Sequence, residues 1–147
     1  IRKLMDAGKN SLQLGIKALE PGKPYMRWAQ AVQNHVEREC GFHLVRGLGG
    51  HGINRKLHDA PFIANSMPLY PGEWPEGAAL AMPGTILALE PMIAVGTNQI
   101  VQEKGKWPIF TADGSMSVHH EHDVLITESG TRILSEGLDE IDDVIPC

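Results

Sequence analysis

Three residues capable of acid–base or metal chemistry lie where an apolar or neutral side chain would cost less free energy. His51 follows a run of glycines, Glu90 lies within an apolar stretch, and Glu121 directly precedes another apolar stretch. A buried carboxylate is unfavourable unless a positive group compensates it. One such carboxylate alone is explained equally well by an ion pair with lysine or arginine, but two of them with a histidine favour a divalent metal ion. Mixed oxygen and nitrogen ligation suits Mn, Fe, Co or Zn.

The segment 117–127, with the sequence SVHHEHDVLIT, predicts a buried strand with a polar front end. Side chains of a strand alternate between its two faces. Glu121 therefore shares a face with His119, whereas His120 and His122 point the other way. We expect Glu121 to be the functional residue and His122 to support it by orienting the ligand side chains. We expect His119 and His120 to be partly exposed neighbours rather than ligands.

The elements that must position these residues follow from apolar periodicity and from turn residues. Apolar residues recur with helical spacing over 1–19 and over 25–39, which predicts two helices. Glycine, proline and asparagine separate the apolar stretches that follow. These stretches predict strands at 42–45, 85–92 and 132–134, an antiparallel meander over 93–127, and an extended surface loop over the proline-rich 59–84. The predicted fold class is α+β, with two helices packed on a curved, mainly antiparallel sheet.

The run GLGGHG at 47–52 fits the dinucleotide-binding pattern G-x-G-x-x-G. That pattern requires a helix to begin at the turn, and Pro61 leaves too little room for one. We therefore expect these glycines to let the backbone pass close to a site while presenting His51. The patterns of helical zinc proteases, zinc nucleobase deaminases and serine hydrolases are absent from the sequence.

Composition narrows the class of protein further. The chain has 147 residues, the length of one domain, and a formal net charge of −5 with scattered lysine and arginine, which gives no basic surface for nucleic acid. Its two cysteines, Cys40 and Cys147, form neither a disulfide framework nor a cysteine-based zinc site. No apolar run approaches the roughly 18 residues of a membrane span. We expect a soluble, cytoplasmic protein with no membrane partner.

Three ordered motifs together resemble the methionine aminopeptidases of the pita-bread metallopeptidase fold, in their bacterial-type form. The motifs are Gly50-His51-Gly52-Ile53 followed by His58, Leu89-Glu90-Pro91-Met92, and Glu121-His122 before Val124-Leu125-Ile126-Thr127, with Trp107 between the last two. The resemblance covers essentially the whole chain. It implies a hydrolase that removes the initiator methionine from nascent polypeptides, in which metal ions activate a water molecule.

The resemblance also implies roles for particular residues. His51, Glu90 and Glu121 resemble metal ligands, with Glu121 bridging two divalent ions (Co, Mn, Fe or Zn), and Glu90 also resembles the catalytic group that handles the protons of the attacking water. His58 resembles the catalytic histidine that contacts the substrate and stabilises the tetrahedral intermediate. Leu57 and Trp107 resemble substrate-binding walls of the methionine pocket.

The sequence departs from the family in its metal ligands. The family uses five protein ligands, of which two aspartates lie on a hairpin upstream of the helix that opens this chain. We therefore expect residues 1–147 to be the C-terminal part of one peptidase domain whose N-terminal part is missing. On that basis we expect this chain alone to bind at most one metal ion, and to bind it weakly. We also expect it to lack peptidase activity. Its exposed sheet edges should favour aggregation.

Two other functions remain open at this point. A proline-specific, prolidase-like peptidase shares the fold, although the last motif, around Glu121, resembles the methionine enzymes more closely. A non-catalytic pita-bread module that binds protein partners is the other alternative. A binding module has no need for carboxylates in apolar strands, so His51, Glu90 and Glu121 speak against it.

Overall fold

The computed structural model describes residues 1–137, and two packed helices open it; Cys147 lies outside the described residues. Helix α1 spans Arg2–Ala18 and helix α2 spans Met26–Gln33, and α2 continues directly into a π-helical segment, η1, at Asn34–Glu39. The helices predicted over 1–19 and 25–39 are therefore confirmed. The buried stripe of α1 repeats every three or four residues, as expected for one packed face: Leu4, Ala7, Gly8, Ser11, Leu12, Gly15 and Ile16.

The two helices approach each other closely at Gly15. A Cβ atom at this position would lie 2.4 Å from the ring of Trp28 and 2.7 Å from Cγ2 of Val32. Both partners on α2 are fully buried. Glycine at this position therefore allows the large indole ring to pack directly against the backbone of α1.

Ten strands follow in the described part of the chain, and every strand pairing is antiparallel. A five-stranded sheet has the order β10-β9-β4-β2-β3, a three-stranded sheet has the order β1-β5-β8, and β6 and β7 form a hairpin. The predicted α+β class with an antiparallel sheet is confirmed. The strands are β1 (His43–Leu44), β2 (Gly49–Gly52), β3 (Asp59–Ala64), β4 (Ile86–Leu89), β5 (Met92–Ala94), β6 (Ile100–Gln102), β7 (Ile109–Thr111), β8 (Ser117–His119), β9 (His122–Thr127) and β10 (Gly130–Ile133).

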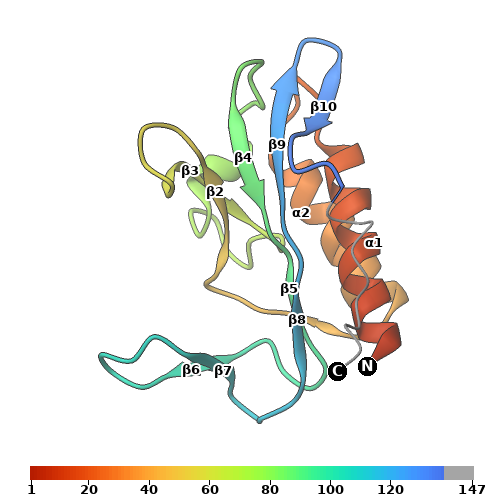
Figure 1. Ribbon diagram of the computed structural model, residues 1–147, viewed down its shortest axis with the longest axis vertical. Coiled ribbons are helices and arrows are strands. Elements are labelled where there is room, and N and C mark those ends of the chain that lie inside the picture. Colours follow the sequence, from red (N-terminus) through yellow and green to blue (C-terminus); the bar gives the residue numbers. More distant parts are fainter. Residues whose placement is uncertain (138–147) are drawn as a thin grey trace.

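The segment from β4 to β9 forms a long nested hairpin rather than the predicted meander. β4 leads into β5 and β8 leads into β9, and the pairs β4–β9 and β5–β8 stack one after the other with β6–β7 at the tip. Figure 1 shows this arm running from β4 down to the projecting β6–β7 hairpin. The prediction was wrong in topology because turn residues mark where the chain bends but not which strands pair across the bends.

The prediction of an extended loop over residues 59–84 was wrong in part. This segment contains the strand β3 and a 3-10 helix, η2, at Pro75–Ala78. Pro61 is tolerated in β3 because that strand is at the edge of its sheet, where a missing N–H need not break the ladder. Trp74 is 3% exposed and donates its indole N–H to the carbonyl oxygen of Phe62 at 2.9 Å. The segment is therefore packed onto the domain.

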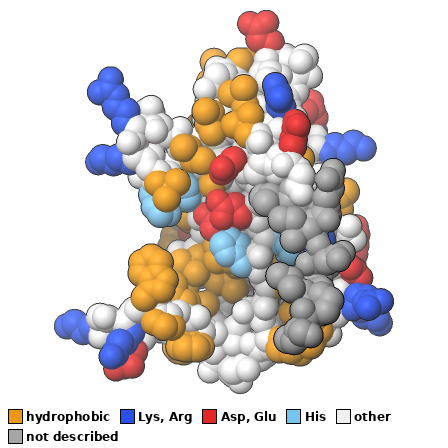
Figure 2. All heavy atoms as spheres, viewed as in Figure 1, with side chains coloured by type: hydrophobic (Ala, Val, Ile, Leu, Met, Phe, Trp, Pro, Cys, Tyr) orange, Lys and Arg blue, Asp and Glu red, His pale blue; other side chains and the backbone are white. Residues whose placement is uncertain are grey.

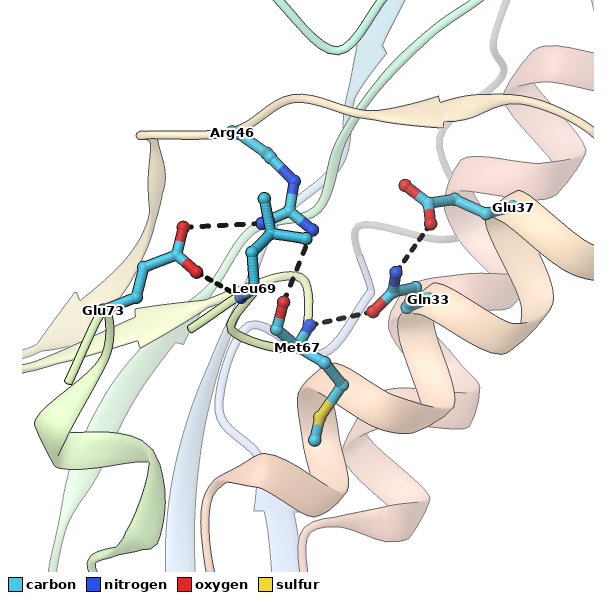
Figure 3. Close-up of polar contacts among 6 residues, drawn as sticks. All are labelled: Gln33, Glu37, Arg46, Met67, Leu69 and Glu73. Atoms are coloured by element: carbon cyan, nitrogen blue, oxygen red, sulfur yellow. Dashed lines mark hydrogen bonds and ion pairs between the residues drawn. The ribbon is translucent and has the colours of Figure 1, made fainter. Parts of the chain in front are cut away.

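Polar contacts attach the connection between β3 and η2 to the rest of the fold (Figure 3). Arg46 lies 3.6 Å from the Glu73 carboxylate and donates to the carbonyl oxygen of Met67 at 3.4 Å. The backbone N–H of Met67 donates to Oε1 of Gln33 on α2 at 2.9 Å, and Gln33 in turn donates to Glu37 at 2.7 Å. The connection is thereby bound both to the segment after β1 and to the second helix.

The core lies between the helices and the strands. The helices gather on one side of the strands in Figure 1. No helix among residues 1–137 is long and apolar enough to cross a membrane. The largest fully buried apolar side chains come from both layers: Trp28, Leu19, Val32, Val36, Leu44, Ile63, Leu87, Leu89, Ile93, Val124 and Ile126.

Candidate metal centre

Strand β2 presents His51 between two glycines that allow neighbouring strands to approach closely. A Cβ at Gly50 would lie 2.2 Å from the carbonyl oxygen of Ala88 on β4, and one at Gly52 would lie 2.1 Å from the carbonyl oxygen of Ala60 on β3. After β2 the chain bends into β3, not into a helix. The glycines therefore allow close strand packing around His51, whereas we expected them to allow a close approach to a site. The absence of a helix after β2 excludes the dinucleotide alternative.

Glu90 and Glu121 lie in two breaks of the nested hairpin that face each other. β4 pairs with β9 up to Leu89, and β5 pairs with β8 from Met92 onward, so the residues between these ladders are free of regular pairing. Asn65, itself 2% exposed, donates its side-chain amide to the carbonyl oxygen of Glu90 at 3.0 Å. Both carboxylates lie at the same space, since one ligand atom of each lies within 4.8 Å of the other.

His119, at the end of β8, completes this group. Its Nε2 atom lies 3.1 Å from Oε2 of Glu90, while Nε2 of His51 lies 3.5 Å from Oε1 of the same carboxylate. One ligand atom each from Glu90, His119 and Glu121 lie within 4.8 Å of one another. The His119 side chain is 47% exposed, as expected for a residue at this position, yet it belongs to the cluster that we expected it merely to border.

The electrostatics of the group reflect an excess of negative charge. Burial, followed by the neighbouring Glu90 carboxylate, raises the pKa of Glu121 above its usual value. A hydrogen bond to Glu90 raises the pKa of His119 despite its partial burial. The Glu90 carboxylate contributes to both shifts, because it disfavours a second negative charge and favours a positive charge close to it. Figure 2 shows acidic and histidine side chains gathered at the centre of this face, with hydrophobic side chains beside them.

The donor set fits a divalent transition-metal ion. Nδ1 of His51 lies 3.0 Å from the carbonyl oxygen of Gly52, and because a carbonyl can only accept, Nδ1 carries the proton. In the neutral ring this leaves a lone pair on Nε2, the atom that faces Glu90. Hydrogen bonding at one ring nitrogen is how metal-binding histidines are commonly oriented. Imidazole and carboxylate groups together suit Mn, Fe, Co or Zn.

A cleft of about 700 Å³ lies next to the Glu90 carboxylate. The rings of His51 and His58 are 4.3 Å apart at its edge, and Trp107, 92% exposed, stands at its border. Leu57 is 68% exposed and is not among the residues that line this cleft. The lining combines the polar group with apolar side chains: His51, His58, Glu90, His119, Met92, Ile100, Trp107 and Phe110.

The other two histidines of the 117–127 segment face helix α1, as the strand alternation predicted. His120 packs against Gly8, where a Cβ would lie 2.6 Å from the imidazole ring. His122 is 3% exposed; its Nδ1 lies 2.8 Å from the hydroxyl of Ser135 and its Nε2 lies 3.3 Å from the amide of Gln13. These contacts anchor the strand that carries Glu121 to the helix behind it.

An antiparallel α+β domain with a carboxylate and histidine group at its centre has the features of a metallopeptidase of the pita-bread fold, represented here in part. Residues 1–128 match the model of metallopeptidase family M24, and the chain belongs to that family. Its relatives within the family include methionine aminopeptidase 1 of Mycobacterium tuberculosis, 41% identical over 139 residues, and the methionine aminopeptidase of Aquifex aeolicus, 35% identical over 135 residues.

These matches cover 91% and 92% of this chain and 50% of each relative. The chain therefore spans about half the length of the curated relatives it matches. The crystal structure of methionine aminopeptidase from Thermotoga maritima superposes with a TM-score of 0.80 at 33% identity, over 91% of this chain and 51% of that one. An X-Pro aminopeptidase from the same organism has a TM-score of 0.65 at 18% identity, over 91% of this chain and 30% of that one, and so shares the fold.

Proposed function

We propose that the protein carrying this chain is a metal-dependent aminopeptidase of the cytoplasm that removes the initiator methionine from nascent polypeptides. The observation that carries the proposal is the convergence of Glu90, Glu121 and two imidazoles beside a cleft lined partly by apolar side chains. The relatives with at least 35% identity named above are methionine aminopeptidases by name.

His51, Glu90 and Glu121 are the residues proposed to hold metal. A divalent cation bound there would act as a Lewis acid and lower the pKa of a water molecule. The Nε2 lone pair of His51 and the carboxylate oxygens supply the appropriate donors. His122 keeps Glu121 in place indirectly, because it anchors the start of β9 to α1 through Gln13.

The remaining steps are assigned to side chains of the cleft. Glu90 accepts a proton from the attacking water and returns it to the leaving amine, as a carboxylate within reach of the water can. His58 donates a hydrogen bond to the oxygen that becomes negatively charged in the tetrahedral intermediate. The apolar side of the cleft takes the methionine side chain, with Trp107 as a wall. Leu57, exposed beside His58, contacts the substrate from outside the cleft.

We infer further that residues 1–147 alone bind one divalent ion at most and do not hydrolyse peptides. The resemblance assigns two aspartate ligands that have no counterpart among the described residues of this chain. A site that lacks them holds the first ion through His51, Glu90 and Glu121 but leaves the second ion with little besides Glu121. Calorimetric titration with Mn²⁺ or Co²⁺ that revealed two tight sites would contradict this inference.

Peptide hydrolysis tests the proposed function. The protein carrying this chain, supplied with Mn²⁺ or Co²⁺, is incubated with a peptide that begins Met-Ala and with one that begins Ala-Pro. Release of free methionine from the first peptide only is the expected result. Cleavage of the Ala-Pro peptide instead would favour a prolidase-like enzyme, and cleavage of neither would favour a binding module.

A further inference from the structure

We propose that His119 is a metal ligand, and that it forms with His51, Glu90 and Glu121 a single-ion site of two imidazoles and two carboxylates contained within this chain. The inference rests on the proposed metallopeptidase function. The inference goes beyond that function because His119 is not among the residues that the family resemblance assigns to metal binding.

The distances among three of these four residues, Glu90, His119 and Glu121, fit one shared ion. Zinc lies about 2.0–2.2 Å from nitrogen and oxygen ligands, so two ligands of one ion are at most about 4.4 Å apart. His119 Nε2 is 3.1 Å from Glu90, and the ligand atoms of Glu90, His119 and Glu121 lie within 4.8 Å of one another. Contraction by a few tenths of an ångström would bring all three onto one ion. His51 Nε2 approaches the same Glu90 carboxylate from the other side, at 3.5 Å.

The local structure explains why His119 points into this group. β8 ends at His119, opposite Met92 on β5, and the chain then crosses the break that carries Glu121. Strand alternation places His119 and Glu121 on one side, while the intervening His120 packs against Gly8 of α1. With His120 packed on α1, His119 and Glu121 lie on the side where Glu90 is found.

A different role for His119 makes the opposite prediction. If the imidazolium served only as an ion-pair partner for Glu90, it would compete with a metal ion for that carboxylate. Removing it would then tighten metal binding. If His119 is a ligand, removing it weakens binding. The direction in which metal affinity changes therefore separates the two roles, whatever the size of the change.

Metal titration of the full 147-residue chain tests the proposal. Co²⁺ and Mn²⁺ are titrated by calorimetry into the natural chain, into His119→Gln, and into His43→Gln as a matched control. His43 is exposed on β1 of the same three-stranded sheet and does not line the cleft. We expect His119→Gln to bind at least about tenfold more weakly, since even orienting partners of ligands cost 10- to 100-fold. His43→Gln should bind as the natural chain does.

Pulsed electron paramagnetic resonance of the Mn²⁺-loaded protein gives a readout that does not depend on activity. The natural chain should show coupling to two imidazole nitrogens, and His119→Gln to one. His119→Asp, which restores a carboxylate ligand, should recover affinity but still show a single coupled imidazole. Because His119 is about half exposed, the variants should keep the metal-free melting temperature, which circular dichroism verifies.

Unchanged or tighter metal binding by His119→Gln would overturn the proposal, as would a natural chain that binds neither ion at millimolar concentration. These outcomes are distinct from failure of the proposed function. If the protein carrying this chain released methionine in a metal-dependent way while His119→Gln bound metal normally, the function would stand and the role of His119 would be wrong.

Discussion

At the scale of single residues, the site combines two carboxylates, Glu90 and Glu121, that repel each other when no cation lies between them. Glu90 is 13% exposed and contacts two imidazoles, whereas Glu121 has a raised pKa caused first by burial and then by Glu90. A carboxyl group with a folded-state pKa above its usual value is destabilised in its ionised form. Without a metal ion the ionised form of Glu121 is disfavoured relative to the free side chain, and a divalent ion bound beside it would favour that form.

Substituting Glu121→Gln tests this electrostatic account. Because the raised pKa disfavours the carboxylate at all pH values above its usual range, the neutral amide should leave the metal-free melting temperature unchanged or raise it. The same variant should lose the rise in melting temperature that Mn²⁺ gives the natural chain. Glu128→Gln, exposed in the turn after β9, is the control and should keep that rise. A lower metal-free melting temperature for Glu121→Gln would contradict the account.

The sequence predicts most of this site but not all of it. His51, Glu90 and Glu121 stand out because polar groups in glycine-rich or apolar contexts are costly, and the structure brings all three around one space. His119 was expected to stay outside the group. Strand alternation correctly puts it on the same face as Glu121, but only the pairing of β8 with β5 shows that this face also meets Glu90.

At the scale of elements, helix α1 is the support that positions the strands next to Glu121 and His119. It contacts the 120–122 segment at Gly8 and Gln13, and the carbonyl oxygen of Leu19 just beyond it accepts a hydrogen bond from the hydroxyl of Thr131 on β10. α2 in turn holds α1 in place through Trp28. Site geometry therefore depends on helix packing that is remote from any metal ligand.

Substituting Gly15→Ala tests this dependence on close packing. The added methyl group would lie 2.4 Å from the Trp28 ring, so one helix must shift. Overpacking of this kind costs about 1–3 kcal/mol, more than the gain of roughly 1 kcal/mol from replacing glycine within a helix. Urea denaturation should show the resulting decrease in the free energy of unfolding. Asn10→Ala, exposed on the same helix, should leave stability equal or slightly higher; equal stability of Gly15→Ala would refute the packing argument.

The helices were predictable because their apolar periodicity spans several turns, and they appear within one residue of the expected ends. Strand β3 was not predictable, because its six residues include Pro61 and lack a long alternation of polar and apolar side chains. Its place at the sheet edge, which makes that proline harmless, depends on pairing with β2 and cannot be inferred locally. The nested order of β4 to β9 was missed for the same reason.

At the scale of the whole molecule, the described chain leaves apolar surface and sheet edges uncovered. β10 and β3 form the two edges of the five-stranded sheet. Val101 and Phe110 face each other across the β6–β7 hairpin and are 50% and 63% exposed. Unpaired edges and exposed apolar side chains promote association. We therefore predict that residues 1–147 self-associate as their concentration rises.

Light scattering over a concentration series measures this association. Val101→Lys should reduce it, because the substitution removes apolar surface and places a charge on the hairpin. Gln99→Lys adds the same charge at an exposed position without removing apolar surface and should reduce it less. A natural chain that stays monomeric at all concentrations and melts in one sharp transition would show that the exposed apolar surface does not cause association.

The most direct test of the central claim is the metal-dependent release of methionine by the protein carrying this chain. With Mn²⁺ or Co²⁺ present, a peptide beginning Met-Ala should yield free methionine, and a chelator should stop the reaction. Glu90→Gln should lower the rate by about 10²–10⁴-fold, the usual contribution of general acid–base catalysis. Release that persisted with the chelator or in Glu90→Gln, or no release at all, would contradict the assignment of this site.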